Sequence, residues 1–251
     1  MSTQANQDGE PKEVNIKIDG TAYRVPEGIS LIKCADSLGH TIPTLCDFKD
    51  LMPSGTCRVC NVLVDGRFQS ACMLKTYDGL EIDNSSEKVV ELRKAVIEMM
   101  FLEGNHICPV CEKSGNCELQ SLAYHYQMTA QRFPQMYPKR KLDASAPNLM
   151  VEYNRCIQCR RCIRGIRTPD DERIFFFENR GENVKLVVDP SRYEDITPQV
   201  AHAASNICPV GALMKKEPGY QVPIGKRHND KMPKEEIRHR ELEAQKEANH
   251  E

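Results

Sequence analysis

The sequence predicts an α+β fold made of three small modules in series. The first observation is the composition: aromatic residues make up only 6% of the 251 residues, tryptophan is absent and 28% of the residues are charged, which leaves modest means for one large apolar core. The second is a total of 12 cysteines, which fall into three groups along the chain. The third is that strand-like and helix-like hydrophobic patterns both occur. Because metal often stabilises small domains, we expect metal to hold the three modules.

The charge balance and the hydropathy pattern exclude several classes of protein. With 34 Lys and Arg against 36 Asp and Glu, the net charge is −2, too small to indicate nucleic acid or an anionic membrane as a partner. No apolar run approaches the roughly 18 to 20 residues of a membrane span. The N-terminal residues 1–12 form a polar tail without the apolar stretch of a signal peptide. We therefore expect a cytoplasmic protein, in which disulfides do not persist and the cysteines have another role.

The first cysteine group has the spacing C-x10-C-x2-C-x11-C and lies in a strand-rich region. Apolar and polar residues alternate over residues 14–18, and an Asp-Gly turn then lets residues 22–25 return antiparallel. A short helix is predicted over residues 30–38, and residues 62–64 lead into a second Asp-Gly turn. Two hairpins with a helix across them predict a β-grasp ferredoxin domain over residues 13–85, which would hold one [2Fe–2S] cluster. Its four predicted ligands are Cys46, Cys57, Cys60 and Cys72.

A helical segment is predicted next, over residues 86–145. Apolar residues recur at close to helical period in residues 87–102, with Ser86 as the N-cap and Gly104 as the C-cap. A further helix is predicted over residues 119–128. The second cysteine group lies between these two helices, so that the helices would hold a metal-binding loop between them.

The second group offers three cysteines, Cys108, Cys111 and Cys117, to a [4Fe–4S] cluster, which leaves one position open. His106 is the nearest imidazole, and a histidine ligand has a precedent in Rieske centres. The alternative is that His106 is a surface histidine and the fourth ligand lies elsewhere. His125, on the second predicted helix, is a poorer candidate. We predict one His and three Cys as the ligand set.

The third cysteine group predicts a ferredoxin-like domain over residues 146–220 that holds one [4Fe–4S] cluster. A C-x2-C-x2-C run followed by a remote Cys-Pro is typical of the binding of such a cube. Between the run and the remote cysteine, residues 173–178 and 184–189 read as a hairpin, and residues 198–206 as a helix that leads to the last ligand. The four predicted ligands are Cys156, Cys159, Cys162 and Cys208.

Some features remain outside the three ligand sets. Cys34 is left over and is predicted to be a buried or half-buried free thiol. Residues 221–251 form a charged arm with few apolar residues, and this arm is either partly helical on a neighbouring subunit or disordered. Five arginines surround the third cysteine group. They form either a solvated face that offsets the charge of an anionic cluster or a docking patch for a partner. They are Arg155, Arg160, Arg161, Arg164 and Arg167.

Together these motifs resemble one family, the N-terminal part of the large iron–sulfur subunit of respiratory NADH dehydrogenase and its short relatives. Among the short relatives the chain is most similar to the diaphorase iron–sulfur (gamma) subunit of soluble NAD-reducing [NiFe]-hydrogenases, over about residues 14–225. The resemblance implies an electron relay between a flavin- and NAD-binding diaphorase subunit and the small and large hydrogenase subunits. FMN, NAD and the Ni–Fe site would belong to those partners.

The sequence offers no catalytic site of its own to this relay. It contains no Gly-x-Gly, so the dinucleotide-binding fingerprint is absent, and no cysteine follows Cys208. We therefore predict no catalytic residues. One alternative is the equivalent subunit of NADH:quinone oxidoreductase, NAD-dependent formate dehydrogenase or an electron-bifurcating complex. The alternative from another class is a zinc-stabilised interaction protein, which the spacing disfavours because zinc sites usually pair two C-x2-C units.

Overall fold

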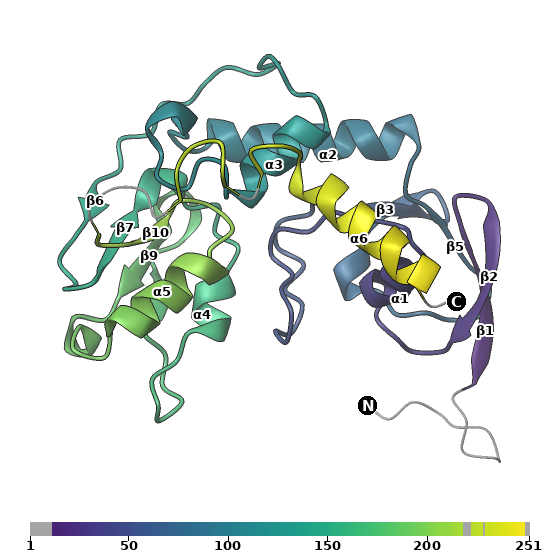
Figure 1. Ribbon diagram of the computed structural model, residues 1–251, viewed down its shortest axis with the longest axis horizontal. Helices are drawn as coiled ribbons and strands as arrows, with labels where there is room; N and C mark the ends of the chain where they lie inside the picture. The colour runs from purple at the N-terminus through teal and green to yellow at the C-terminus, as the bar shows by residue number, and fades with distance from the viewer. Residues whose placement is uncertain (1–11, 218–221, 228, 249–251) are drawn as a thin grey trace. The chain divides into compact units, whose positions relative to one another are not determined.

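The computed structural model describes residues 12–217, 222–227 and 229–248, in which helices and strands both occur (Figure 1). The predicted α+β class is confirmed. Tertiary contacts divide the chain into two units. Unit 1 consists of residues 1–44, 58–96 and 235–251, and unit 2 of residues 45–57 and 97–234. The predicted polar tail lies outside the described residues except for Lys12, and so do residues 221, 228 and 249–251 of the predicted arm.

Unit 1 contains a five-stranded sheet of order β2-β1-β5-β3-β4. The pairing of β1 with β5 is parallel, and the other pairings are antiparallel. The two predicted hairpins are therefore present, one at each edge of the sheet. The elements are β1 (Glu13–Ile18), β2 (Thr21–Pro26), α1 (Leu31–Ser37), β3 (Asn61–Val64), β4 (Arg67–Ser70), the 3-10 helix Ala71–Met73 and β5 (Leu80–Asp83).

The core of unit 1 follows from the alternation in β1. Val14, Ile16 and Ile18 are at most 1% exposed, while the residues between them face solvent. Helix α1 covers this apolar face with four buried residues, among them Leu31 and Cys34. Each fully buried aliphatic side chain contributes about 1.5–3 kcal/mol relative to exposure. The predicted burial of Cys34 is thus confirmed, and the side chain belongs to the apolar core.

Helix α2 (Glu87–Leu102) has the predicted bounds and is anchored to the sheet of unit 1 by Arg93. This arginine is 3% exposed. Its guanidinium donates to the carbonyl oxygens of Asn61 and Asn84 and to Oδ1 of Asn84, at 2.7–3.1 Å. The first half of the helix is therefore held by hydrogen bonds to a charged donor, which are stronger than those between neutral groups.

Unit 2 contains a three-stranded sheet of order β10-β7-β6 and a separate hairpin of β8 and β9. The hairpin was predicted. The three-stranded sheet was not, because its strands are short and β10 is far in sequence from the other two. The elements are the 3-10 helix Cys108–Val110, α3 (Glu118–His125), β6 (Leu142–Asp143), β7 (Leu149–Glu152), the 3-10 helix Tyr153–Arg155, α4 (Arg161–Gly165), β8 (Phe175–Glu178), the 3-10 helix Gly181–Asn183, β9 (Lys185–Val188), the 3-10 helix Pro190–Arg192, α5 (Pro198–Ile207) and β10 (Leu213–Lys215).

The charged C-terminal arm contains a helix, α6 (Lys234–Ala248), which is the last element in Figure 1. In unit 1, Arg238 of this helix forms an ion pair with Asp36 of α1. In unit 2, Lys234 forms an ion pair with Glu118 at 2.9 Å. The described part of the arm is therefore partly helical, while its predicted place on a neighbouring subunit stays a prediction. No described helix has the length and apolarity that crossing a bilayer requires.

Candidate iron–sulfur sites

The four cysteines predicted for the third cluster line one small cavity in unit 2. Cys156 directly follows the 3-10 helix Tyr153–Arg155, Cys162 lies in α4, and Cys208 directly follows α5. Helix α5 begins at Thr197, whose side-chain oxygen accepts from the amide of Val200, an N-cap that fixes where the helix starts and so where it delivers Cys208. The structure therefore brings together the complete predicted ligand set.

The thiols in this cavity need a cationic partner to ionise. Burial raises the pKa of Cys156 to about 11, and burial together with neighbouring thiols raises the pKa of Cys159 and Cys162 still further. Four thiolates packed together in a buried space are unfavourable on their own. Iron supplies the compensating positive charge, since metal binding deprotonates cysteine ligands. The donor set thus fits a [4Fe–4S] cluster.

The backbone of the third motif is shaped to donate hydrogen bonds to sulfur. The amides of Gln158, Arg161 and Ile163 donate to the sulfurs of Cys156, Cys159 and Cys162, respectively. Gln158 and Arg160 have φ values of 54° and 63°, a left-handed conformation that costs a non-glycine residue roughly 1–2 kcal/mol. Successive backbone amides in such turns make concave anion sites, and hydrogen bonds to the sulfurs tune the potential of a cluster.

The three cysteines of the middle motif also come together in unit 2. Burial and the neighbouring Cys111 raise the pKa of Cys108, and burial raises the pKa of Cys117 to about 12 although its sulfur accepts from the amides of Gln120 and Leu119. Cys117 occupies the N-cap position of α3. The helix therefore fixes one ligand, and the 3-10 helix Cys108–Val110 fixes the others. Three thiols are in place for a cluster.

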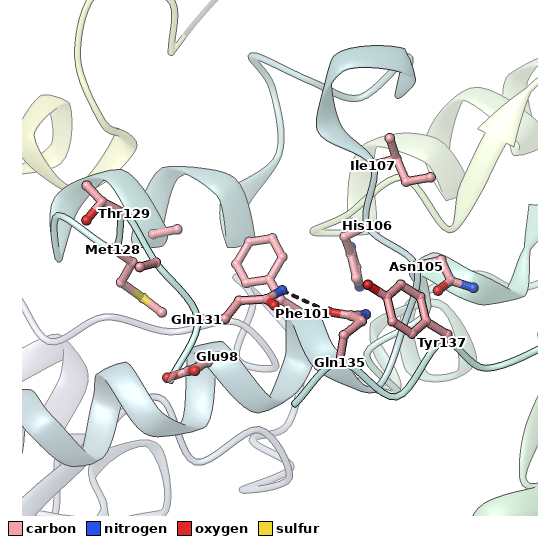
Figure 2. Close-up of a pocket in the computed structure, with 12 residues that line it drawn as sticks. Glu98, Phe101, Asn105, His106, Ile107, Met128, Thr129, Gln131, Gln135 and Tyr137 are labelled. Atoms are coloured by element: carbon pink, nitrogen blue, oxygen red, sulfur yellow. Dashed lines mark hydrogen bonds between the residues drawn. The ribbon is translucent and has the colours of Figure 1, made fainter. Parts of the chain in front are cut away.

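His106 lies in the wall of a pocket, together with Phe101 and Asn105 (Figure 2). Its ring meets that of Phe101 edge-on, with centroids 5.4 Å apart, and hydrogen-bonds to the backbone of Met100. Burial and the nearby Arg155 and Arg140 lower the pKa of His106 to about 4, so the ring is neutral near pH 7, as a metal ligand must be. The described contacts of His106 are not with the three cysteines. Its ligation remains a prediction.

The pocket beside His106 has a volume of about 410 Å³. Figure 2 shows Phe101 and Tyr137 around it, and a hydrogen bond of 2.8 Å joins Gln131 to Gln135. His125, the poorer candidate, is exposed in the last turn of α3 with its ring against Tyr126. It stands at the opposite end of the helix from the cysteine in the N-cap position.

The four cysteines predicted for the [2Fe–2S] cluster are at most 6% exposed. In unit 2, the amide of Cys46 donates to the sulfur of Cys57 at 3.4 Å. In unit 1, Cys60 and Cys72 belong to the core beneath the sheet, and the amide of Ala71 donates to the carbonyl oxygen of Cys60 at 3.1 Å. The residue after Cys57 is Arg58, whose φ of 62° gives this C-x2-C loop a left-handed turn like those in the third motif.

The arginines around the third motif are not all a solvated face. Arg160 is exposed, and Arg155 forms an ion pair with Glu112 at 2.8 Å. Arg161 is 1% exposed, so the interpretation as a solvated face is wrong for it. Its partner is Glu118, the residue directly after Cys117. Sequence reasoning missed this pair because nothing local links an arginine to a carboxylate 43 positions away.

Three family models match successive parts of the chain. Residues 11–87 match a 2Fe-2S iron–sulfur cluster binding domain. Residues 93–132 match the NADH-ubiquinone oxidoreductase-G iron–sulfur binding region, and residues 146–214 match the ferredoxin-like domain of NADH-quinone oxidoreductase subunit 3. The predicted series of one [2Fe–2S] domain followed by [4Fe–4S] regions is confirmed.

The chain is similar over most of its length to subunits of NAD-reducing hydrogenases. It is 39% identical over 233 residues to the gamma subunit of the NAD-reducing hydrogenase HoxS of Cupriavidus necator, covering 92% of this chain and 98% of that subunit. It also matches a chain in a crystal structure of NAD+-reducing [NiFe]-hydrogenase in the H2-reduced state, with 38% identity, a TM-score of 0.80 and coverage of 91% and 98%, respectively.

Longer relatives share only their iron–sulfur part with this chain. The alpha subunit of the NADPH-Fe(3+) oxidoreductase of Geobacter sulfurreducens is 31% identical over 205 residues, which are 81% of this chain and 24% of that subunit. The mitochondrial 78 kDa subunit of NADH-ubiquinone oxidoreductase of Candida albicans is 30% identical over 208 residues, which are 81% of this chain and 29% of that subunit. The chain belongs to the family of iron–sulfur gamma subunits of NAD-reducing hydrogenases, which is related to the large iron–sulfur subunit of NADH dehydrogenase.

Proposed function

We propose that the chain relays electrons between a flavin- and NAD-binding diaphorase subunit and the small and large subunits of a [NiFe]-hydrogenase, in the reaction H2 + NAD+ = NADH + H+. The single observation that carries the proposal is the cavity lined by Cys156, Cys159, Cys162 and Cys208. The similarity to a hydrogenase gamma subunit over nearly its whole length supports the choice of terminal enzyme. FMN, NAD and the Ni–Fe site belong to the partners, and the complex works in the cytoplasm.

The ligand sets are part of the proposal, as are the module boundaries 13–85, 86–145 and 146–220. When bound, the clusters supply one-electron transfer with little rearrangement. The chain's own residues hold them by thiolates, exclude water by burial, and donate amide hydrogens to sulfur. The proposed sets are Cys46, Cys57, Cys60 and Cys72 for the [2Fe–2S] cluster, His106, Cys108, Cys111 and Cys117 for the first [4Fe–4S] cluster, and Cys156, Cys159, Cys162 and Cys208 for the second.

The test separates relaying electrons from catalysis. The isolated, fully metallated chain should exchange electrons with an artificial one-electron dye but should not reduce NAD under hydrogen, because its sequence has no Gly-x-Gly fingerprint and no cysteine after Cys208. Mixed with a flavin-bearing diaphorase subunit, it should speed NADH oxidation by distant acceptors. Replacing Cys208 by Ala should abolish that gain. Sustained NAD reduction by the isolated chain would overturn the proposal, as would zinc in place of iron.

A further inference from the structure

The guanidinium of Arg161 is buried within unit 2 and binds Glu118 with both of its terminal nitrogens. Nη1 donates to Oε1 of Glu118 at 2.7 Å, and Nη2 donates to Oε2 at 2.9 Å. The side chains are only 2% and 14% exposed. Such a parallel pair of bonds fixes orientation as well as distance, because the planar fork of arginine matches the carboxylate.

The same guanidinium contacts a third segment of the chain. Nη2 also donates to the carbonyl oxygen of Asp47 at 2.9 Å, and the ring of Phe48 lies 4.9 Å from the guanidinium carbon. Nη1 approaches the carbonyl oxygen of Ile207 at 3.5 Å. Arg161 is thus bound to residues 45–57, to the start of α3 and to the end of α5, all of them within unit 2.

Each hydrogen-bond partner of Arg161 is one residue away from a proposed cluster ligand. Asp47 follows Cys46, Glu118 follows Cys117, and Ile207 precedes Cys208; Arg161 itself precedes Cys162. A single side chain therefore connects segments that carry ligands of all three proposed clusters. Neighbouring Arg164 reinforces the first connection with hydrogen bonds to the carbonyl oxygens of Cys46 and Met52.

Stability alone is a poor explanation for this buried charge. Burying an ion pair costs so much solvation that well-packed apolar residues are often as stable. Among the described atoms, Nε of Arg161 is buried and has no hydrogen-bond partner, which adds to the cost. The charge does have a use at this place: Nη1 lies 3.5 Å from the carbonyl oxygen of Ile207, the residue before the proposed ligand Cys208, so the guanidinium is held beside the second [4Fe–4S] site. A fixed positive charge beside a cluster favours its more negative, reduced form.

We propose that Arg161 is a positioning residue of the electron relay, which holds the ligand-bearing segments around Cys46, Cys117 and Cys162 in register and raises the reduction potential of the second [4Fe–4S] cluster. The proposal rests on the ligand sets proposed above. Lysine cannot replace it fully, because one ammonium group lacks the planar fork that reaches the carboxylate and a carbonyl oxygen together. Glu118 keeps a second cation, Lys234, so loss of Arg161 does not leave the carboxylate alone.

The experiment compares Arg161→Met, Arg161→Lys and the control Arg180→Met in the full chain with its clusters. Arg180 has the same charge and lies in unit 2, but it is exposed between β8 and β9, so its charge is screened by water. Three quantities are measured: iron per chain, the potential of each cluster by redox titration, and magnetic coupling between clusters by electron paramagnetic resonance.

The expected results separate geometry from charge. Arg161→Met should shift the potential of the second [4Fe–4S] cluster to a more negative value and change the intercluster coupling. Arg161→Lys should restore most of the potential but not the coupling, and Arg180→Met should resemble the wild type in both. If Arg161 were purely structural, its replacement would lower the iron content or the melting temperature, and lysine would not restore the potential separately from the coupling.

Several outcomes would overturn the proposal. One is a fully metallated Arg161→Met or Arg161→Lys protein with wild-type potentials and coupling. Another is a control Arg180→Met that shifts the potential as far as Arg161→Met does. If Arg161→Met loses its iron, the test of the positioning role is the intercluster coupling in Arg161→Lys. Wild-type coupling in that variant would reject the positioning role. If the wild-type chain lacked three cluster signals, the proposed function itself would be contradicted. Failure of the Arg161 proposal and failure of the proposed function are therefore distinguishable.

Discussion

The backbones of Gly104 and Asn154 approach so closely that a Cβ added to Gly104 would lie 2.1 Å from the carbonyl oxygen of Asn154. The same oxygen accepts from the amide of Asn105 at 3.0 Å, and Nδ2 of Asn105 donates to Oδ1 of Asn154 at 2.9 Å. The segment before the middle cysteine motif is therefore bonded directly to the segment before the third motif. Only glycine allows this contact, since the clash would be with backbone atoms.

Gly104→Ala is expected to destabilise unit 2 by about 1–3 kcal/mol, the usual range for overpacking. Gly165→Ala is the matched control, because its Cβ would meet the mobile Cδ1 of Ile207 at 2.4 Å rather than backbone. That control lies in α4, where alanine is the better helix former. Urea denaturation of the two variants checks the prediction. Equal urea midpoints in the two variants would contradict the prediction, because they would show that the backbone around Gly104 adjusts without loss of stability.

Iron content should distinguish ligand cysteines from the buried free thiol. The wild-type chain should hold ten iron atoms, the sum of one [2Fe–2S] and two [4Fe–4S] clusters. Cys208→Ala should lose the four irons of one cube, because it removes a donor from a cavity with four thiols. Cys34→Ala should keep all ten, since Cys34 lies within the apolar core of unit 1. Iron and acid-labile sulfide assays give the answer, and a drop in the Cys34 variant would mean that one ligand is misassigned.

The role of His106 requires a spectroscopic test, since its described contacts are with Phe101 and Met100 rather than with the middle cysteines. If it binds iron, His106→Ala should make the middle cluster labile. His106→Cys should keep four irons but lower the potential, because thiolate donates more charge than imidazole. His125→Ala, at an exposed position of α3, is the control and should change neither. Unchanged potentials in both His106 variants would identify the residue as a bystander.

The buried carboxylate of Glu98 predicts a pH-dependent stability. Burial opposes its ionisation, but hydrogen bonds from the side chain of Arg132 and from the amides of Arg132 and Phe133 outweigh burial and lower the pKa of Glu98. A carboxyl whose pKa is lower in the folded state stabilises the fold above its ordinary value of roughly 4.3, and this contribution is lost as the pH falls through the folded pKa.

Glu98→Gln should therefore be less stable than wild type near pH 7, by about 1–3 kcal/mol, because amide donors are left without their charged acceptor. The difference between the two proteins should shrink as the pH falls below roughly 4.3. Denaturation midpoints measured across this range check both the sign and the window. Lys94→Met is a suitable control on the same helix, since Lys94 forms a partly exposed pair with Glu91. A difference that grows on acidification would contradict the sign of the pKa shift.

Local pattern was enough to predict the parts of the fold that are determined locally. The alternation of residues 14–18 defines β1 because one face of that strand is buried. The bounds of α2 were predicted because Ser86 and Gly104 flank an unbroken helical period. Helix α3 ends three residues before the prediction, at His125, and Gln127 there has a φ of 52° that no helix accommodates.

Long-range pairings could not be predicted, because the local pattern of a strand does not identify a partner far away in the sequence. Strand β10 has three residues and pairs with β7, whose partner residues lie some sixty positions earlier; Leu213 faces Val151 and Lys215 faces Leu149. Helix α4 has only five residues and begins after the left-handed Arg160, a turn set by the cysteine motif rather than by helix propensity. Cysteine spacing predicted the cavity of the third motif, because ligand geometry constrains the sequence directly. For the middle motif, cysteine spacing does not identify the imidazole that would be the fourth ligand.

The place of Cys208 directly after α5 also has a consequence for biosynthesis. The chain is synthesised from its N-terminal end, so all four proposed [2Fe–2S] ligands have been made once Cys72 is added. The cavity of the third motif, by contrast, still lacks Cys208 when Cys162 is added, because Cys208 directly follows α5. Iron that reaches this part of the chain before α5 has been made therefore meets only three of the four proposed thiols.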